Sequence, residues 1–170
     1  MCVWERVVRA CPKARLLVVG RGLHGEDRRF EAEVCRRRLA NTVMAVGWVP
    51  PAELPALLAA ADVAFYPMDD TLINRTKCPV KLADLLALGV PVVGEAVGQV
   101  AEYLAHGAGI LVPSGDVDRS VTALLTLLRN PERARRVGRA GRERLTRYFA
   151  WSVQGERVEA FYREVLAHST

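Results

Sequence analysis

The sequence predicts an α/β fold in which helices flank a parallel β-sheet and an all-helical segment follows. Short β-branched runs alternate with amphipathic stretches, and glycine or proline ends several of them, while the last third has helical periodicity throughout. The 170-residue chain is 51% hydrophobic and 25% charged, which suffices for one sizeable core and argues against disorder. We therefore expect residues 1–170 to form a single domain.

The first half of the chain gives three alternations of helix and strand. Prolines at the start of the third helix are tolerated, because the first N–H groups of a helix have no partner within it. A helix at the very start of an α/β chain further suggests that a preceding strand is missing. In order, we expect a helix at 2–11, a strand at 15–20, a helix at 26–39, a strand at 43–47, a helix at 51–60 and a strand at 62–66.

The second half begins with a polar loop, after which Pro79 begins a helix that Gly89 ends. Asp116 can cap a later helix through its side chain. In order, we expect a helix at 79–88, a strand at 91–94, a helix at 99–104, a strand at 109–112, and helices at 116–129, 131–148 and 151–168.

Composition excludes several classes of protein. The cysteines at 2, 11, 35 and 78 form no C-x-x-C pair and do not cluster with histidine, so we expect neither a disulfide framework nor a metal site. The sequence contains no secretory signal pattern and no run of eighteen apolar residues, so we expect a cytoplasmic protein without a spanning helix. The net charge of +5 favours anionic partners.

A glycine-rich turn follows the first strand. Residues 20–25, G-R-G-L-H-G, fit the pattern G-x-G-x-x-G, whose glycines allow a tight turn and a close approach to phosphate. A site for NAD or FAD also needs an acid about twenty residues later, to hold the ribose. The next strand instead ends in Val46-Gly47-Trp48. We therefore interpret residues 20–25 as a ligand-carrying turn at the sheet edge rather than as a dinucleotide site.

The segment from Thr76 to Val93 reads T-K-C-P-V-K-L-A-D-L-L-A-L-G-V-P-V-V. It resembles the P-x-K-x-x-E-x-x-A-x-G-x-P-V-V signature of family 4 glycosyltransferases, which have the two-domain GT-B fold. The order and spacing of further motifs extend the resemblance over residues 15–166. These motifs are 17–22, 46–50, 57–62, Gly98 with Glu102, 107–116, 130–131 and 149–152.

The resemblance implies a Rossmann-like domain, the C-terminal half of a retaining enzyme, that binds a nucleotide-diphosphate sugar and needs no other cofactor and no metal. Independently, a carboxylate at Asp84 can accept ribose hydroxyls, while the N–H groups of Val80 and Lys81 at the helix start, with Lys77, can hold a diphosphate. The expected substrate-binding residues are Gly20, Arg21, Gly22, Val49, Lys77, Cys78, Pro79, Val80, Lys81 and Asp84. No catalytic residue is assigned.

The sequence departs from the family pattern at Thr76. The family often has a first acid eight residues before the second, where it contacts the transferred sugar, and Thr76 occupies that place. Asp69 or Asp70 is a candidate substitute. The family's phosphate-clamping Arg and Lys, and the acceptor-binding domain, would lie upstream of Met1. A non-catalytic module that keeps the fold is the alternative, whereas the acids and histidine of a related epimerase are absent.

Residues 131–148 contain seven arginines beside a narrow apolar stripe. The pattern permits two interpretations, which are contact with an anionic membrane surface and a solvated face over packed apolar residues. No nucleic-acid-binding motif accompanies it. The sequence therefore predicts a nucleotide-sugar donor and a missing N-terminal domain as partners, no nucleic acid, and a place in the cytoplasm or at the membrane periphery.

Overall fold

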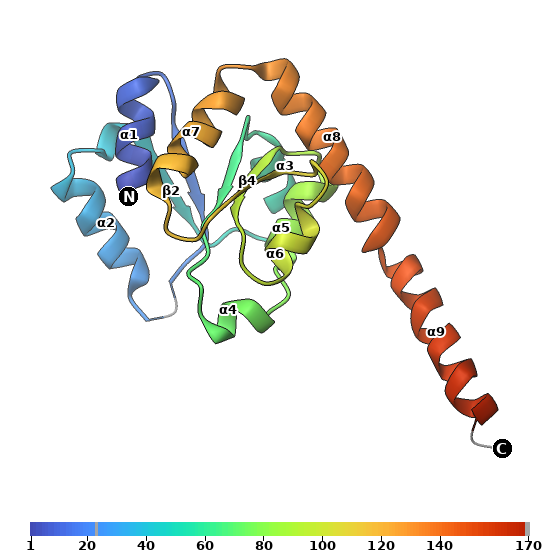
Figure 1. Ribbon diagram of the computed structural model, residues 1–170. Coiled ribbons are helices and arrows are strands. Elements are labelled where there is room, and N and C mark those ends of the chain that lie inside the picture. Colours follow the sequence, from blue (N-terminus) through green and yellow to red (C-terminus); the bar gives the residue numbers. More distant parts are fainter. Residues whose placement is uncertain (23, 169–170) are drawn as a thin grey trace.

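The structure, a computed structural model, describes residues 1–22 and 24–168 (Figure 1). Leu23, in the middle of the glycine motif, therefore lies outside the described residues. The strands form two parallel sheets, one of two strands in the order β1-β2 and one of three in the order β3-β4-β5. Their bounds are β1 Leu16–Val19, β2 Val43–Gly47, β3 Ala64–Tyr66, β4 Val92–Glu95 and β5 Ile110–Val112.

The helices connect and flank these strands, and the chain ends in three consecutive helices, as the sequence predicts (Figure 1). The predicted fold class, parallel strands with flanking helices and a helical C-terminal segment, is therefore confirmed. The helices are α1 Cys2–Ala10, α2 Glu26–Arg36, α3 Leu54–Ala59, α4 Leu72–Thr76, α5 Val80–Ala87, α6 Gln99–Tyr103, α7 Val117–Leu128, α8 Pro131–Tyr148 and α9 Trp151–His168, with a 3₁₀ turn at Ala40–Thr42.

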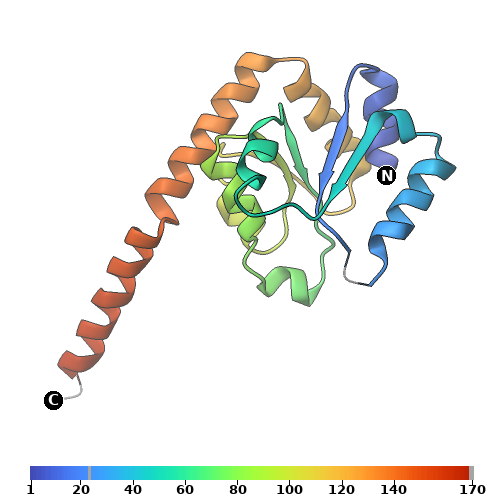
Figure 2. The ribbon, with the colours of Figure 1, turned by 180° about the vertical axis from the view of Figure 1, so that it is seen from behind.

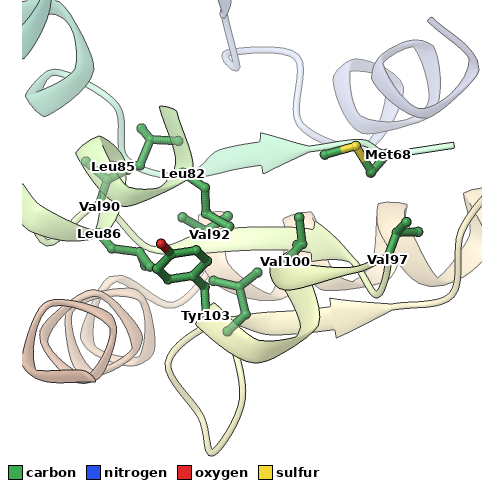
Figure 3. Packing of buried hydrophobic residues seen from close by; sticks show 10 residues of the cluster. Met68, Leu82, Leu85, Leu86, Val90, Val92, Val97, Val100 and Tyr103 are labelled. Atoms are coloured by element: carbon green, nitrogen blue, oxygen red, sulfur yellow. The ribbon is translucent and has the colours of Figure 1, made fainter. Parts of the chain in front are cut away.

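The central strand β4 divides the core into two clusters. Val92 belongs to a cluster with the buried leucines of α5 and with Val100 and Tyr103 of α6 (Figure 3). Its neighbour Val93 belongs to a second cluster, formed with residues of α1, α7 and β5. Successive strand residues point to opposite faces of a sheet, so β4 has a covered face on each side, as in a doubly wound fold.

Helix α8 packs closely against the backbone of the domain through two buried glycines. A Cβ atom at Gly138 would lie 2.0 Å from the carbonyl oxygen of Gly89, the second residue after α5. A Cβ atom at Gly141 would lie 2.8 Å from the carbonyl oxygen of Ala108. Any larger residue would force the helix away, so these glycines fix the position of α8 against α5.

Helix α9 projects away from the rest of the fold in both views (Figures 1 and 2). None of its residues is buried, and Trp151, Phe161, Tyr162 and Leu166 are all exposed. Within the described part of the chain, no helix combines the length and the apolar character that crossing a membrane requires.

Four predicted elements need correction, one of which is the strand expected at 62–66, which begins only at Ala64. The second helix ends at Arg36 rather than at residue 39, because Leu39 turns back into the core before the 3₁₀ turn. Residues 51–53 form a turn instead of opening α3, in which the N–H groups of Glu53 and Leu54 donate to the carbonyl of Pro50. The polar loop before Pro79 contains the unexpected helix α4, which the Thr71 side chain caps by accepting from the N–H of Asn74.

Candidate functional site

The predicted binding residues follow the carboxyl ends of the strands or lie in α5. In open parallel sheets, loops at the carboxyl ends of the strands form the ligand-binding crevice. Helix α4, which follows β3, and the N-terminal end of α2, which follows β1, lie at the same end of the molecule (Figures 1 and 2). The candidate site is therefore this carboxyl edge, together with the N-terminal end of α5.

Gly20 brings the turn after β1 close to α5. Its φ of +128° lies in the region that favours glycine, and its N–H donates to the carbonyl of Gly47 at 2.8 Å, which ties the turn to the end of β2. A Cβ atom at Gly20 would lie 3.8 Å from Nζ of Lys81. Two segments about sixty residues apart in sequence thus present a bare backbone and an ammonium group to the same space.

The start of α2 is occupied by its own acids. Oε2 of Glu26 accepts from the N–H of His24 at 2.7 Å, and a Cβ atom at Gly22 would lie 2.7 Å from the same oxygen. This bond from His24 is the main reason why the pKa of Glu26 lies below its ordinary value. Asp27 adds a second acid to the first turn. The carboxylates stabilise this helix end, so an anionic ligand would meet repulsion there.

The start of α5 offers the opposite electrostatics. Its first turn contains no acid and no side chain caps it. Pro79, at the N-cap, is buried, whereas Val80, the first residue of the helix, is 63% exposed to solvent. The N–H of Val80 donates to Cys78 at 3.1 Å, while that of Lys81 has no acceptor among the described residues. Of the two helix ends, α5 is the one suited to an anion.

The outer face of α5 continues from this end to Asp84. Lys81 and Asp84 are both exposed and lie three residues apart, which places them on neighbouring turns of one face. Leu82, Leu85 and Leu86 occupy the opposite, buried face. The carboxylate of Asp84 is in no ion pair or hydrogen bond within the described part of the chain, so it is available to a ligand.

Two of the predicted binding residues lie just before α5. Lys77 and Cys78 are both exposed. Sγ of Cys78 lies 3.9 Å from the hydroxyl oxygen of Tyr103. Burial, with a smaller contribution from Cys78, raises the pKa of Tyr103 to about 12, so this phenol stays protonated at neutral pH.

Arg21, Gly22 and Val49, which were also predicted to bind the substrate, lie in the loops at this edge. Arg21 is exposed beside Gly22, which is half-buried. Val49 is half-buried in the turn that leads from β2 to α3, and no hydrogen bond joins it to α5 among the described residues.

One of the two candidate substitutes for the missing first acid, Asp70, is already engaged, whereas the Asp69 side chain is exposed and forms no ion pair or hydrogen bond among the described residues. Asp70 forms a bidentate pair with Arg75, whose Nε and Nη2 lie 2.5 Å and 2.8 Å from its oxygens. Hydrogen bonding to Arg75 lowers the pKa of Asp70. The hydroxyl of Thr76 donates back to the helix, to the carbonyls of Leu72 and Ile73. The Asp70 carboxylate and the hydroxyl proton of Thr76 are therefore both engaged in this arrangement.

The prediction missed Glu95, a buried acid at the end of β4. Its Oε2 accepts from the N–H of Met68 at 2.8 Å, and its Oε1 accepts from the N–H of Gly115 at 3.2 Å. The Ser114 hydroxyl donates to the carbonyl of Met68 at 2.9 Å. Glu95 thus ties the loops after β3 and β5 together. An acid directly after a buried strand was the available sequence signal.

Gly98 also positions the edge. Its φ is +49°, and a Cβ atom there would lie 2.6 Å from the carbonyl oxygen of Arg75. The loop after β4 therefore packs against the end of α4, just before Lys77. A hollow of about 270 Å³ lined by Arg6, Arg9, Ala10 and Val121, and a larger one along α9, include no residue of α5.

Comparison with known proteins identifies the family of this chain. Residues 2–130 match the family model described as "Glycosyl transferases group 1". A relative from Corynebacterium glutamicum, a GDP-mannose-dependent monoacylated alpha-(1-6)-phosphatidylinositol monomannoside mannosyltransferase, is 30% identical over 159 residues, which cover 90% of this chain and 40% of the relative. The chain thus spans about two fifths of the length of this relative.

Two solved structures share the fold. A sucrose-phosphate synthase from Thermosynechococcus elongatus aligns with a TM-score of 0.77 at 27% identity, over 98% of this chain and 42% of that one. The Anabaena protein HepE, in complex with UDP-glucose, aligns with a TM-score of 0.76 at 18% identity, over 95% of this chain and 44% of that one. Both alignments extend over almost the whole chain, so the long C-terminal segment belongs to the shared fold.

Proposed function

The chain belongs to the glycosyl transferases group 1 family, as the C-terminal half of its GT-B fold, and we propose that it binds the nucleotide-diphosphate sugar of a retaining glycosyltransferase. In this proposal the start of α5 receives the diphosphate, with the amide of Lys81 and the ammonium groups of Lys77 and Lys81 opposite its charge. Asp84, one turn further along, accepts the ribose hydroxyls. No metal takes part.

The single observation that best supports this proposal is the approach of Lys81 to Gly20. The ammonium group lies 3.8 Å from the position that a Cβ atom of Gly20 would take, so it faces a backbone stripped of side chain. A phosphate bound beside both groups would meet the ammonium group and a backbone that no side chain shields. The start of α2, with its two acids, offers no such position.

The residues of α5 contact the diphosphate and the ribose in this proposal, and they do not select the nucleotide base. The Corynebacterium relative is named as GDP-mannose-dependent, and HepE was crystallised with UDP-glucose. We expect the diphosphate and ribose, rather than the base, to provide most of the recognition by α5. In this view Val49 and the turn after β2 lie where the base would bind.

Thermal denaturation with UDP, GDP, ADP and NAD tests donor binding. We expect at least one nucleoside diphosphate to raise the melting temperature of the chain while NAD does not, because ligands that bind only the folded state stabilise it. Asp84→Asn should abolish that rise. Asp62→Asn is the matched control, since Asp62 is equally exposed but precedes β3, at the opposite end of the strands. Melting curves that no nucleotide moves would refute donor binding by this chain.

The acceptor site and the catalytic groups belong, in this proposal, to a second domain. The chain spans about two fifths of its relative, and transfer between two substrates requires both to be held in position. The exposed apolar residues of α9, among them Trp151 at 91% and Phe161 at 62%, form the face on which we expect that domain to pack. We therefore expect the 170-residue chain alone to show no transfer activity.

A non-catalytic nucleotide-binding module is the second candidate. Thr76 favours it, because its hydroxyl donates to the carbonyls of Leu72 and Ile73 and no acid stands in its place. Sugar transfer by the full-length protein, measured as release of nucleoside diphosphate in the presence of acceptor, separates the two. Binding without any turnover would establish the module.

We further propose that the protein works at a membrane surface. The name of the Corynebacterium relative includes a phosphatidylinositol monomannoside, which is a lipid-linked sugar. A lipid-linked acceptor is presented at the interface between membrane and water. Within this proposal, the partners are a sugar nucleotide and an anionic lipid surface, with no nucleic acid.

A further inference from the structure

The net positive charge of the chain resides in one helix. Helix α8 contains seven arginines and two glutamates, a net charge of +5, which equals the net charge of the whole chain. The 17 other basic residues are balanced by 17 other acidic ones. The rest of the molecule is thus neutral overall. The long-range attraction of the whole protein for anions therefore originates in α8.

The arginines of α8 differ from those elsewhere in lacking acidic partners. Arginines of α1, α2, α4, α7 and α9 form ion pairs. No arginine of α8 does so within the described residues. Arg144 donates to the carbonyl of Glu102 and lies over the rings of Tyr148 and Phe149, and Arg147 lies over Tyr148. The remaining arginines of α8 are exposed and unpaired, so their charge is uncompensated.

Three of these side chains form an arginine row along α8: Arg135, Arg139 and Arg142. Their spacing of four and then three residues places them on one flank of the helix, beside the buried stripe of Ala134, Gly138 and Gly141. Like charges at this spacing destabilise a helix. An anionic surface along the row would offset the repulsion between these arginines, so binding to such a surface would be favourable.

A flat surface fits the row better than a groove does. The helix lies on the outside of the domain (Figures 1 and 2). Glu132 and Glu143 stand on the outermost line of α8, opposite the buried stripe. Insertion of the helix into a nucleic-acid groove would press both carboxylates against phosphates. A bilayer that contacts only the flank of the arginine row leaves them in water.

We infer that the arginine row of α8 docks this domain on a bilayer rich in anionic phospholipids. The row would hold phosphate groups of the lipid surface by charge-assisted hydrogen bonds, of the kind arginine forms with phosphate. This inference specifies the surface for the membrane placement proposed above. It does not depend on nucleotide binding, because no residue of the row belongs to the candidate donor site.

Co-sedimentation of the 170-residue chain with vesicles, without nucleotide, tests the inference. One set of vesicles contains phosphatidylcholine alone and the other contains phosphatidylcholine with phosphatidylglycerol. We expect binding to the second set only, weakening as salt is raised. Replacing Arg135, Arg139 and Arg142 together by Gln should weaken it about ten-fold or more. The matched control replaces Arg28, Arg29 and Arg157 by Gln, the same loss of charge on α2 and α9, and should weaken it far less.

Circular dichroism and melting curves of both variants establish that each remains folded. Equal losses in the two variants would show that net charge alone drives binding and would overturn a role for the row. Equal binding to both kinds of vesicle, or to neither, would also overturn it. So would tighter binding of a short RNA or DNA duplex than of anionic vesicles at the same salt, because the row would then serve a nucleic acid.

Discussion

At the scale of single residues, charge distinguishes the two helix starts at the carboxyl edge of the strands. Glu26 and Asp27 neutralise the start of α2, whereas α5 begins without an acid and with Lys81 beside the Gly20 turn. The sequence predicted Lys81 and Asp84 as exposed groups on one helix, because that follows from helical spacing. It could not predict that Lys81 lies beside Gly20, which depends on how the two sheets are placed.

Glu95 illustrates what residue-level prediction missed. Its carboxylate accepts from two backbone N–H groups that belong to loops far apart in sequence, and no local pattern announces such a contact. We predict that Glu95→Gln destabilises the fold by about 1–3 kcal/mol, because one N–H would then face an amide NH₂ instead of an oxygen. Urea denaturation measures the loss. An unchanged unfolding midpoint would contradict the tie between the two loops.

Glu33 gives a pH prediction. Hydrogen bonds from Arg36 and then Arg37 lower the pKa of Glu33 from 4.5 to about 2, and Arg37 also bonds Glu5, which joins α2 to α1. A depressed pKa stabilises the folded state above the unfolded value, and this stabilisation is lost as pH falls from about 4.5 to about 2. Melting temperatures of Glu33→Gln should therefore fall less steeply than those of the native chain between these two pH values. Parallel curves would refute the linkage.

At the scale of elements, the sequence predicted the strands and the long helices well. α6, α8 and α9 agree with prediction to within a residue, because proline, capping and periodicity mark their ends. Short elements were harder. Helix α4 is held by the Thr71 cap and by packing of Gly98 against Arg75, and the second of these is a tertiary contact without a local signal.

The contact between α8 and the end of α5 gives an element-scale prediction. Gly138→Ala should destabilise the domain by about 1–3 kcal/mol, because its Cβ would overlap the carbonyl of Gly89. Gly155→Ala is the matched control on α9, where a Cβ would meet nothing within 4 Å. That change should instead be neutral or stabilise by up to about 1 kcal/mol, through helix propensity. Chemical denaturation of both variants measures the difference, and equal effects would contradict the close packing of α8.

At the scale of the whole molecule, α9 stands apart from a fold that is otherwise packed around β4. None of its residues is buried, and a side-chain hydrogen bond from Gln154 to the carbonyl of Tyr148 joins it to α8. The sequence predicted this helix from its periodicity. It could not predict that the helix projects outward with its aromatic side chains exposed.

Removal of residues 151–170 tests whether the rest of the domain folds without α9. We expect the free energy of unfolding to change by no more than about 1 kcal/mol, the size of one hydrogen bond. We also expect size-exclusion chromatography to show less self-association, because an exposed apolar surface is removed. A loss of several kcal/mol would mean that α9 is part of the folding unit.

The family assignment and the fold agree with the resemblance found in the sequence. In the proposed donor site the start of α5, rather than that of α2, receives the diphosphate. The charge of Lys81 should therefore matter for nucleotide binding, and the charge of a distant lysine should not.

Isothermal titration of the nucleoside diphosphate that raises the melting temperature most, against two single variants, measures this directly. Lys81→Gln removes the ammonium group beside Gly20, and Lys13→Gln removes an equally exposed one that precedes β1. We predict that Lys81→Gln weakens binding about ten-fold or more, as loss of a charged hydrogen-bonding partner does, while Lys13→Gln leaves it unchanged. Equal affinities of the two variants would contradict the placement of the diphosphate at α5.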